Sequence, residues 1–286
     1  MSRQLDLTKD YKVYKTKSGR QIQEPGHNLK KFQEYILRKI ESIHFHQAAY
    51  GGILNRNLQG AVKCHQGASL IFKTDIKNFF GSTTRQHLVT ALRFYPMTEE
   101  MKRFIRKYLK YCLYFNGHRK ILPTGAPTST LLSNIAARPI DIMATTFVNV
   151  IAKKQGVEVK YTRYIDDLTF SFPVYPKIDR AKFEHLVRKL VLHGGYYLND
   201  KKTKWIYKKK DNMEVLGITQ AQDGELGIAR SKRRRLRKQL YELGKRQESL
   251  PESLFGQLMY LKTVNYKQYD KLLKVYQDAL EKAAQC

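Results

Sequence analysis

Acidic residues are scarce in this chain of 286 residues. It carries 25 Asp and Glu against 53 Lys and Arg, which gives a formal net charge of +28 at pH 7. A field of this sign favours polyanions and speeds their capture. The 19 Tyr and 13 Phe add rings that can stack on bases. A ribosomal-type binder or a merely soluble basic protein would share this composition, so charge alone does not identify the function.

Cysteine and long apolar runs are also scarce. Cys64, Cys112 and Cys286 are far apart and form no CxxC pair, which argues against a zinc site and against a disulfide framework. The N-terminal residues MSRQLDLTKD lack the apolar core of a secretion signal. No apolar run approaches the roughly 18 to 20 residues that cross a bilayer. We therefore expect a cytoplasmic protein with no membrane contact.

The order of the expected elements indicates an α+β fold. Apolar spacing predicts amphipathic helices over 29–43 and 179–193, a basic helix from Thr98 to about Tyr114, and a long buried helix over 128–153. Residues 69–75 read as a buried strand, and residues 157–172 as a β-hairpin. Short strands are expected over 203–207, 213–218 and 225–228. This order predicts a sheet with helices on one face.

The few carboxylates occur at informative places. Asp166 and Asp167 stand at the tip of the expected hairpin, within YTRYIDDLTFS, and Asp75 ends the strand SLIFKTD. Carboxylate oxygens are the ligands that magnesium prefers, and nucleotidyl transfer uses two divalent ions. An isolated Asp-Asp pair is more often a solvated turn, and a lone Asp at a strand end is more often a cap. The two features together favour a metal site.

The chain resembles bacterial reverse transcriptases of the retron and group II intron kind, with retron enzymes as the better match. The segments that carry the resemblance keep the order of the family's motifs along the chain. They are YKTKSGRQIQEPGHNLKKFQ, FKTDIKNFF, LPTGAPTSTLLSN, YTRYIDDLTFS, LNDKKTKW and VLGIT. A single Asp-Asp motif is weak, whereas six segments in the right order are specific.

The resemblance implies a right-hand polymerase with fingers, a palm built on an antiparallel sheet, and a small helical thumb. The expected divisions are 1–70 for the N-terminal part of the fingers, 71–80 for the palm strand with the first catalytic Asp, 81–123 for fingers and palm helices, 124–226 for the palm, and 227–286 for a basic helical thumb.

The resemblance also implies roles for individual residues. Asp75, Asp166 and Asp167 match the family's catalytic metal ligands. Phe80 matches the aromatic residue under the incoming sugar, where a ring would exclude a 2′-hydroxyl, and Phe79 is then the core residue. The remaining residues expected to bind the dNTP are Lys17, Arg20, Ile76, Gly125, Pro127 and Lys202. For the two finger cations the alternative is a solvated basic loop, and for Lys202 it is an ordinary surface lysine.

A further set of residues is expected to contact primer or template: Tyr164, Ser129, His65, Arg233, Arg234, Arg235 and Arg237. The arginines belong to RSKRRRLRKQ, which has seven cations in ten residues and suits the phosphates of an RNA–DNA duplex. The alternative is a solvated basic face or a sorting signal. For Tyr164 the alternative is core packing, and for His65 it is a structural histidine.

Several positions depart from the family's pattern. Thr124 stands where a polar residue such as Gln is usual, Thr130 where Pro is frequent, and Ile165 where Ala or Val is commoner. The retron Asn-Ala-x-x-His motif keeps only its histidine, His65, and Val-Thr-Gly reads Val-Leu-Gly. These departures bear on the retron subclass and leave the polymerase motifs intact.

The expected activity is RNA-directed DNA polymerisation with dNTPs and two Mg²⁺ ions, for which Mn²⁺ could substitute. By resemblance to retrons, the partners are a structured noncoding RNA that serves as template and primer, an RNA–DNA hybrid, and a separate effector protein in antiphage defence. The product would be branched, RNA-linked DNA (msDNA). One alternative is a defence reverse transcriptase with other priming or untemplated synthesis. The other is a non-catalytic RNA-binding scaffold.

Overall fold

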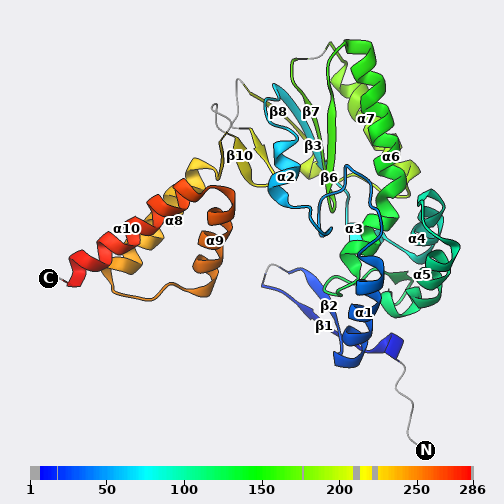
Figure 1. Cartoon of the computed structure of the whole chain (residues 1–286), viewed down its shortest axis with the longest axis horizontal. Coiled ribbons are helices and arrows are strands. Elements are labelled where there is room, and N and C mark those ends of the chain that lie inside the picture. The colour runs from blue at the N-terminus through cyan, green and yellow to red at the C-terminus, as the bar shows by residue number, and fades with distance from the viewer. Residues whose placement is uncertain (1–6, 18, 176, 209–212, 221–224, 285–286) are drawn as a thin grey trace, which may run out of the picture.

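The computed structural model describes residues 7–17, 19–175, 177–208, 213–220 and 225–284. Its described part combines antiparallel sheets with helices, so the α+β prediction is confirmed. The fingers and the central sheet lie together, and the C-terminal helices stand to one side of them (Figure 1). Separate apolar clusters support the central sheet, the fingers, the small sheet and the C-terminal helices.

The central sheet has the strand order β6-β7-β3-β8, and every neighbouring pair is antiparallel. Its strands are β3 (Leu70–Asp75), β6 (Lys160–Tyr164), β7 (Asp167–Phe172) and β8 (Lys204–Tyr207). Phe72 and Phe170 pack their rings against Phe183 of helix α7 (Arg180–His193), with centroids 5.5 Å apart in both pairs. This aromatic layer holds the sheet on its helices.

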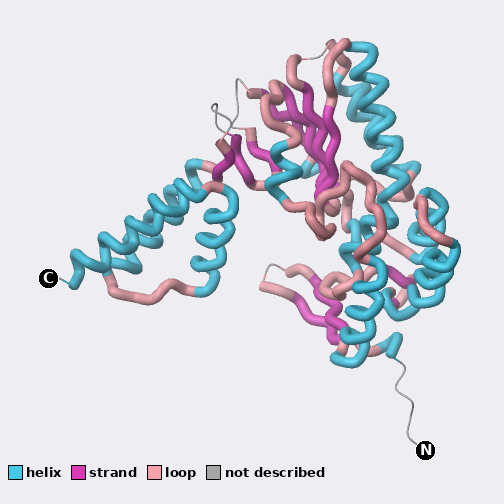
Figure 2. Tube along the Cα trace, in the orientation of Figure 1, coloured by secondary structure: helices cyan, strands magenta, loops and turns pink. Residues whose placement is uncertain are grey.

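Helix α6 (Ser129–Gln155) runs beside the sheet (Figure 2). By length and composition alone it could cross a bilayer, and within the described residues no other helix passes that test. The sequence expectation that no apolar run approaches this length is therefore wrong. However, Ile140, Ala144 and Val148 are buried in the core of the central sheet, which is the position of a core helix.

The fingers contain a hairpin, several helices and a second apolar core. Gly26 precedes α1. The Thr98 hydroxyl accepts a hydrogen bond of 3.2 Å from the Met101 amide, which confirms the expected helix start at Thr98. The elements are η1 (Leu7–Lys9), β1 (Tyr11–Lys15), β2 (Gln21–Pro25), α1 (His27–Ile40), α2 (Leu58–Lys63), α3 (Phe79–Ser82), α4 (Arg85–Ala91), η2 (Leu92–Phe94), α5 (Glu99–Cys112), β4 (Tyr114–Phe115) and β5 (Lys120–Ile121).

A small sheet connects the central sheet to a helical C-terminal unit. After η3 (Asp200–Lys202) and β8 come β9 (Glu214–Val215), β10 (Ile218–Gln220) and β11 (Leu226–Gly227), in the order β11-β10-β9. Helices α8 (Arg230–Lys245), α9 (Glu252–Val264) and α10 (Tyr266–Ala284) follow. Leu236, Leu240, Leu258 and Leu261 give these helices a core of their own, as expected of a helical thumb.

Candidate active site

The register of the central sheet brings the three aspartates together. Asp75, the last residue of β3, is the direct partner of Asp167, the first residue of β7. The amide of Ile76 donates a hydrogen bond of 2.9 Å to the carbonyl oxygen of Asp166. Antiparallel neighbours lie within about 5.5 Å of one another. The end of one strand and the tip of the adjacent hairpin therefore form a single carboxylate cluster.

The hairpin tip is a tight, strained turn. Tyr164 pairs with Asp167, which leaves a two-residue loop of Ile165 and Asp166. Such loops require a positive φ at their first position, where Gly is usual, and Ile165 has φ 58°. A β-branched residue in this region costs about 1–3 kcal/mol. Gly51 lies directly against it, since a Cβ there would come within 2.3 Å of the Ile165 side chain.

A buried arginine holds this turn in place. Arg163 is fully buried and donates from Nε and Nη2 to the two oxygens of Asp141 at 2.8 and 2.7 Å. Its Nη1 donates to the side-chain oxygen of Asn134 and to the carbonyl oxygen of Ile165, both at 2.8 Å. The strained residue is thus tied to helix α6, and the surrounding network offsets the cost of its backbone conformation.

Burial and nearby negative charge work against ionisation of Asp166 and Asp167. Burial, and then the charge of Asp166, raises the pKa of Asp167 to about 6. Burial likewise raises the pKa of Asp166, with the charge of Asp75 adding to the effect. Asp75 is 2% exposed, and its Oδ2 accepts a hydrogen bond from the Lys202 ammonium. This contact raises the pKa of Lys202. The cluster therefore needs positive charge close by.

The donor set fits divalent cations, although it is not yet arranged around one. In the part of the chain that the structure describes, no three His, Cys, Asp or Glu side chains already converge as a metal site. However, Asp75 Oδ1 is buried and makes no hydrogen bond with the described residues. A buried carboxylate oxygen without a partner is costly unless something binds it. Hard oxygen donors of this kind suit Mg²⁺ or Mn²⁺.

A cavity of about 460 Å³ opens beside the aspartates. Strands and loops of the fingers and of the central sheet both contribute to its wall. The lining residues include Arg20, Gln23, Asp75, Ile76, Asn78, Phe80, Asn116, Arg119, Thr124, Asp166, Asn199 and Lys202. A mixed wall of carboxylates, cations and amides beside the aromatic rings of Phe79, Phe80 and Tyr114 is suited to a nucleoside triphosphate.

The cavity gathers several of the predicted residues. Arg20, Ile76, Phe80 and Lys202 all line it with Asp75 and Asp166. Phe79 is 3% exposed and belongs to the core of the central sheet, whereas Phe80 is half-buried and packs toward the fingers. Both residues line the cavity, so the expected division between a core ring and a ring that faces the nucleotide stays a prediction.

Other predicted dNTP residues lie outside this cavity. Lys17 is exposed in the turn between β1 and β2, and neither Gly125 nor Pro127 lines the wall. Gly125 has φ 117°, and a Cβ there would come within 2.9 Å of Ile22. The structure therefore gives Gly125 a backbone role, which lets the Leu122–Pro127 segment approach β2.

Two predicted nucleic-acid contacts are corrected. His65 is fully buried, and its ring nitrogens lie 2.7 Å from the hydroxyls of Ser171 and Thr162. Burial lowers its pKa to about 3, so the ring is neutral. Ser129 is 2% exposed and donates to the carbonyl oxygen of Pro123 at 2.6 Å. Neither side chain can reach RNA here because both are enclosed by the protein.

Tyr164 remains a candidate for the primer side, since it is half-buried and lies in register with Asp167.

Sequence reasoning missed part of the cavity wall. Arg119 and Asn116 come from the β4–β5 hairpin, and the Arg119 guanidinium donates to the carbonyl oxygen of Gly81 at 3.3 Å. Gln23 is buried, and its side-chain oxygen accepts from the Thr124 amide at 2.8 Å. The available signal was Asn116-Gly117, a turn dipeptide directly after Tyr114-Phe115, which indicates a hairpin.

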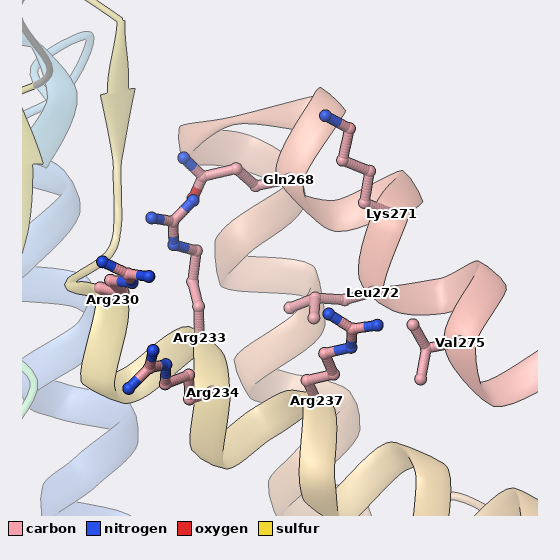
Figure 3. A pocket seen from close by; sticks show the side chains of 8 residues that line it. All are labelled: Arg230, Arg233, Arg234, Arg237, Gln268, Lys271, Leu272 and Val275. Atoms are coloured by element: carbon pink, nitrogen blue, oxygen red, sulfur yellow. The ribbon is translucent and has the colours of Figure 1, made fainter.

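The predicted thumb arginines lie apart from the carboxylates. Arg233, Arg234 and Arg237 project from α8 beside α10, and they line a cavity of about 570 Å³ with Arg230 and Lys271 (Figure 3). Arg233 Nε is buried and has no hydrogen-bond partner within the described residues. Arg235 is exposed and does not line this cavity. The face has the charge and the free donors to bind phosphates.

Three carboxylates at adjacent strand ends, beside a triphosphate-sized cavity on a sheet flanked by fingers and thumb, define a template-directed nucleotidyltransferase. The sequence matches the family described as "Reverse transcriptase (RNA-dependent DNA polymerase)" over residues 8–220. The chain therefore belongs to the reverse transcriptase family and is an RNA-directed DNA polymerase. The family match ends before helix α8.

Curated relatives include retron enzymes from Escherichia coli and Myxococcus xanthus. The Retron Ec86 reverse transcriptase of Escherichia coli is 28% identical over 268 residues, which are 93% of this chain and 78% of the relative. The Retron Ec83 reverse transcriptase of Escherichia coli is 28% identical over 236 residues, 78% of this chain and 72% of the relative. The Retron Mx65 reverse transcriptase of Myxococcus xanthus is 28% identical over 269 residues, 89% of this chain and 60% of the relative.

Solved structures share the fold. Telomerase from Candida albicans aligns with a TM-score of 0.51 at 12% identity, covering 96% of this chain. Apo telomerase from Candida tropicalis aligns with a TM-score of 0.50 at 11% identity, covering all of this chain. The chain spans 55% and 58% of those longer chains, and the likeness concerns the polymerase fold.

Proposed function

We propose that this polymerase copies a cognate structured RNA into DNA that stays linked to it, as a retron reverse transcriptase in antiphage defence. The retron relatives support this proposal. The observation that carries the catalytic part is the pairing of Asp75 with Asp167, next to the 460 Å³ cavity. The proposed setting is the cytoplasm, and the proposed partners are the RNA, its RNA–DNA hybrid, dNTPs and a separate effector protein.

Asp75, Asp166 and Asp167 are proposed to hold two Mg²⁺ ions. When bound, such ions lower the pKa of an attacking 3′-hydroxyl and neutralise the triphosphate and its leaving group. The support is the unpartnered Asp75 Oδ1, together with the burial that raises the pKa values of Asp166 and Asp167. The contact between Lys202 and Asp75 gives the cluster its cation in the described state. Lys202 is 61% exposed, so it can leave Asp75 and contact a triphosphate instead.

The remaining cavity residues are proposed to contact different parts of the nucleotide. Arg20 and Arg119 supply guanidinium groups, whose fixed fork of donors suits phosphate oxygens. Phe80 lies under the sugar and excludes a 2′-hydroxyl. Gln23 and Thr124 brace the floor through their mutual hydrogen bonds of 2.8 Å. We propose that 1–70 and 81–123 act with the palm as fingers, and that 227–286 forms the thumb, which tracks the duplex.

Primer extension tests the enzymatic part of this proposal. Purified protein with a primed RNA template, Mg²⁺ and dNTPs should extend the primer, whereas rNTPs should not support extension. Recovery and sequencing of nucleic acid that copurifies from the native host tests the retron part. A discrete-length DNA joined to RNA through a branch supports it. Unbranched DNA, or DNA without a template, would instead favour a defence reverse transcriptase with other priming.

A further inference from the structure

A second cavity, of about 760 Å³, lies on the outside of the central unit between α7 and the start of α3. Its residues take no part in the catalytic arrangement above, except that Asn78 lines both cavities. Tyr196 and Leu198 are buried at 0% and 7% exposure, whereas Leu192 and Tyr197 are 52% and 69% exposed. The cavity thus combines an apolar floor with an aromatic ring turned to solvent.

The backbone that carries the exposed Tyr197 ring is held by hydrogen bonds to the end of β3 and the segment after it. The amide of Lys77 donates to the carbonyl oxygen of Tyr197 at 2.8 Å, and the amide of Asn199 donates to the carbonyl oxygen of Asp75 at 2.9 Å. Residues Ile76 and Leu198 form an antiparallel bridge between these bonds. Because side chains alternate along an extended segment, Leu198 points inward and Tyr197 outward. A ring held in this way loses little conformational freedom when a partner stacks on it.

The charges around the cavity are unbalanced in favour of cations. Lys77 and Lys189 line it. Its acidic lining residue, Asp200, is engaged by Arg188, which also pairs with Glu184 at 2.9 Å. The remaining cations therefore face solvent without a matching carboxylate on the described wall. They are placed to attract phosphate groups.

We infer that this cavity binds an unpaired segment of RNA, with a base stacked on Tyr197 and the adjoining phosphates on Lys77 and Lys189. A stacked ring beside cations is how proteins hold single strands without reading their sequence. A paired helix keeps its bases stacked inside and has no free face for Tyr197. The site goes beyond the proposed function, because Lys77, Lys189 and Tyr197 do not line the cavity beside the aspartates, although the backbone at Asn199 is hydrogen-bonded to that of Asp75.

Photocrosslinking of the full chain tests this inference. The probe is a 12-nucleotide oligouridine that carries 5-iodouridine, which crosslinks to aromatic side chains on irradiation. Mass spectrometry of the digested product should find the crosslink on the peptide that contains Tyr197. Lys77→Gln with Lys189→Gln should lower the yield at that peptide at least tenfold and leave crosslinks elsewhere unchanged. Duplex RNA that carries the same base should give no crosslink at Tyr197.

Matched variants separate the ring from the fold. Tyr197→Phe should bind the oligouridine at this site as the wild type does, and Tyr197→Ala should lose this binding. Both variants should melt at the wild-type temperature. Both variants should extend a short primed template at the wild-type rate. Absence of the Tyr197 crosslink in the wild type, or a yield that the lysine substitutions do not change, overturns this inference alone. Failure of the wild type to extend the primer overturns the proposed function alone.

Discussion

The palm and the thumb differ in how their charged side chains are arranged: the palm buries and pairs them, whereas the thumb exposes cations. In the palm, Arg163 and Asp141 are both fully buried. The three guanidinium nitrogens of Arg163 donate to Asp141, to Asn134 and to the carbonyl oxygen of Ile165. In the thumb, Arg234, Arg235 and Arg237 are exposed, and α8 carries Glu242 as its single acidic residue. Reaction chemistry needs groups fixed within fractions of an ångström. Holding a duplex by its phosphates requires a positive field and mobile donors.

This contrast predicts that palm substitutions act through geometry and that thumb substitutions act through affinity and salt.

Asp167→Asn should lower the rate of primer extension by at least about 10³-fold, because a metal ligand and its charge are lost. RNA binding should stay within about twofold. The pKa of Asp167 is raised to about 6 in the folded state, above its value in the unfolded chain. At pH 7 the ionised carboxylate is therefore less favourable in the folded state than in the unfolded state. Its neutral isostere should therefore raise the free energy of unfolding, by about 1 kcal/mol after allowance for solvent at this half-buried position. Single-turnover extension and thermal melting measure the two effects, and a variant that melts lower than the wild type would contradict this electrostatic account.

Arg163→Met should lower the free energy of unfolding by about 3–5 kcal/mol, because Asp141 is left buried and unpaired. Urea denaturation followed by circular dichroism gives the value. The matched control is Arg163→Met with Asp141→Leu, which removes both charges and should recover most of the stability. The recovered double variant should still extend primers slowly, since nothing then holds the carbonyl of Ile165. Extension at the wild-type rate in that double variant would show that the turn does not depend on the network.

Phe80→Ala should reduce the preference for dNTPs over rNTPs by about 10- to 100-fold, in line with the 1–3 kcal/mol that a pocket gains by excluding a small group. Competing extension reactions with dCTP and rCTP report the ratio of kcat/KM directly. Phe79→Leu is the control, because Phe79 packs in the core and should affect stability rather than sugar choice. Unchanged sugar selectivity in Phe80→Ala would remove this ring from the role of gate.

Arg233→Gln, Arg234→Gln and Arg237→Gln together should weaken duplex binding by about tenfold at moderate salt, with kcat nearly unchanged. Each lost phosphate contact should reduce the slope of log affinity against log salt by about 0.7–0.9. Fluorescence anisotropy with an RNA–DNA duplex over a series of KCl concentrations measures this. Arg235→Gln is the comparison, since Arg235 lies outside the cavity of Figure 3. An unaltered salt slope in the triple variant would place the duplex elsewhere.

The sequence was sufficient for the parts of the site that follow from local pattern. The run of β-formers on each side of Ile165-Asp166 predicted the hairpin. The position of Asp75 at the end of a buried strand predicted that it lies near Asp166 and Asp167. Other parts depend on tertiary packing. His65 stands between Cys64 and Gln66, where no local pattern marks it as buried, and the docking of α2 on β6 and β7 buries it. The Arg163–Asp141 pair was not anticipated, because arginine is rarely buried without a partner and the partner is distant in sequence.

The cavity wall shows the same limit. Strands β4 and β5 have two residues each, which is too short for any periodic pattern to place Arg119 at the active site. Lys17 and Gly125 were assigned by motif position, yet the described conformation puts the first in an exposed turn and gives the second a backbone role. Motif order therefore located the catalytic strands more reliably than it located the residues around the substrate.

The joint action of Asp75, Asp166 and Asp167 is what RNA-templated DNA synthesis by this chain is proposed to require. Its most direct test is extension of a labelled DNA primer on an RNA template, with dNTPs and Mg²⁺, by the wild type and by Asp75→Asn at equal concentration. We expect full-length product from the wild type and none above background from the variant, although both fold and bind the template alike. Extension by Asp75→Asn at the wild-type rate would contradict it.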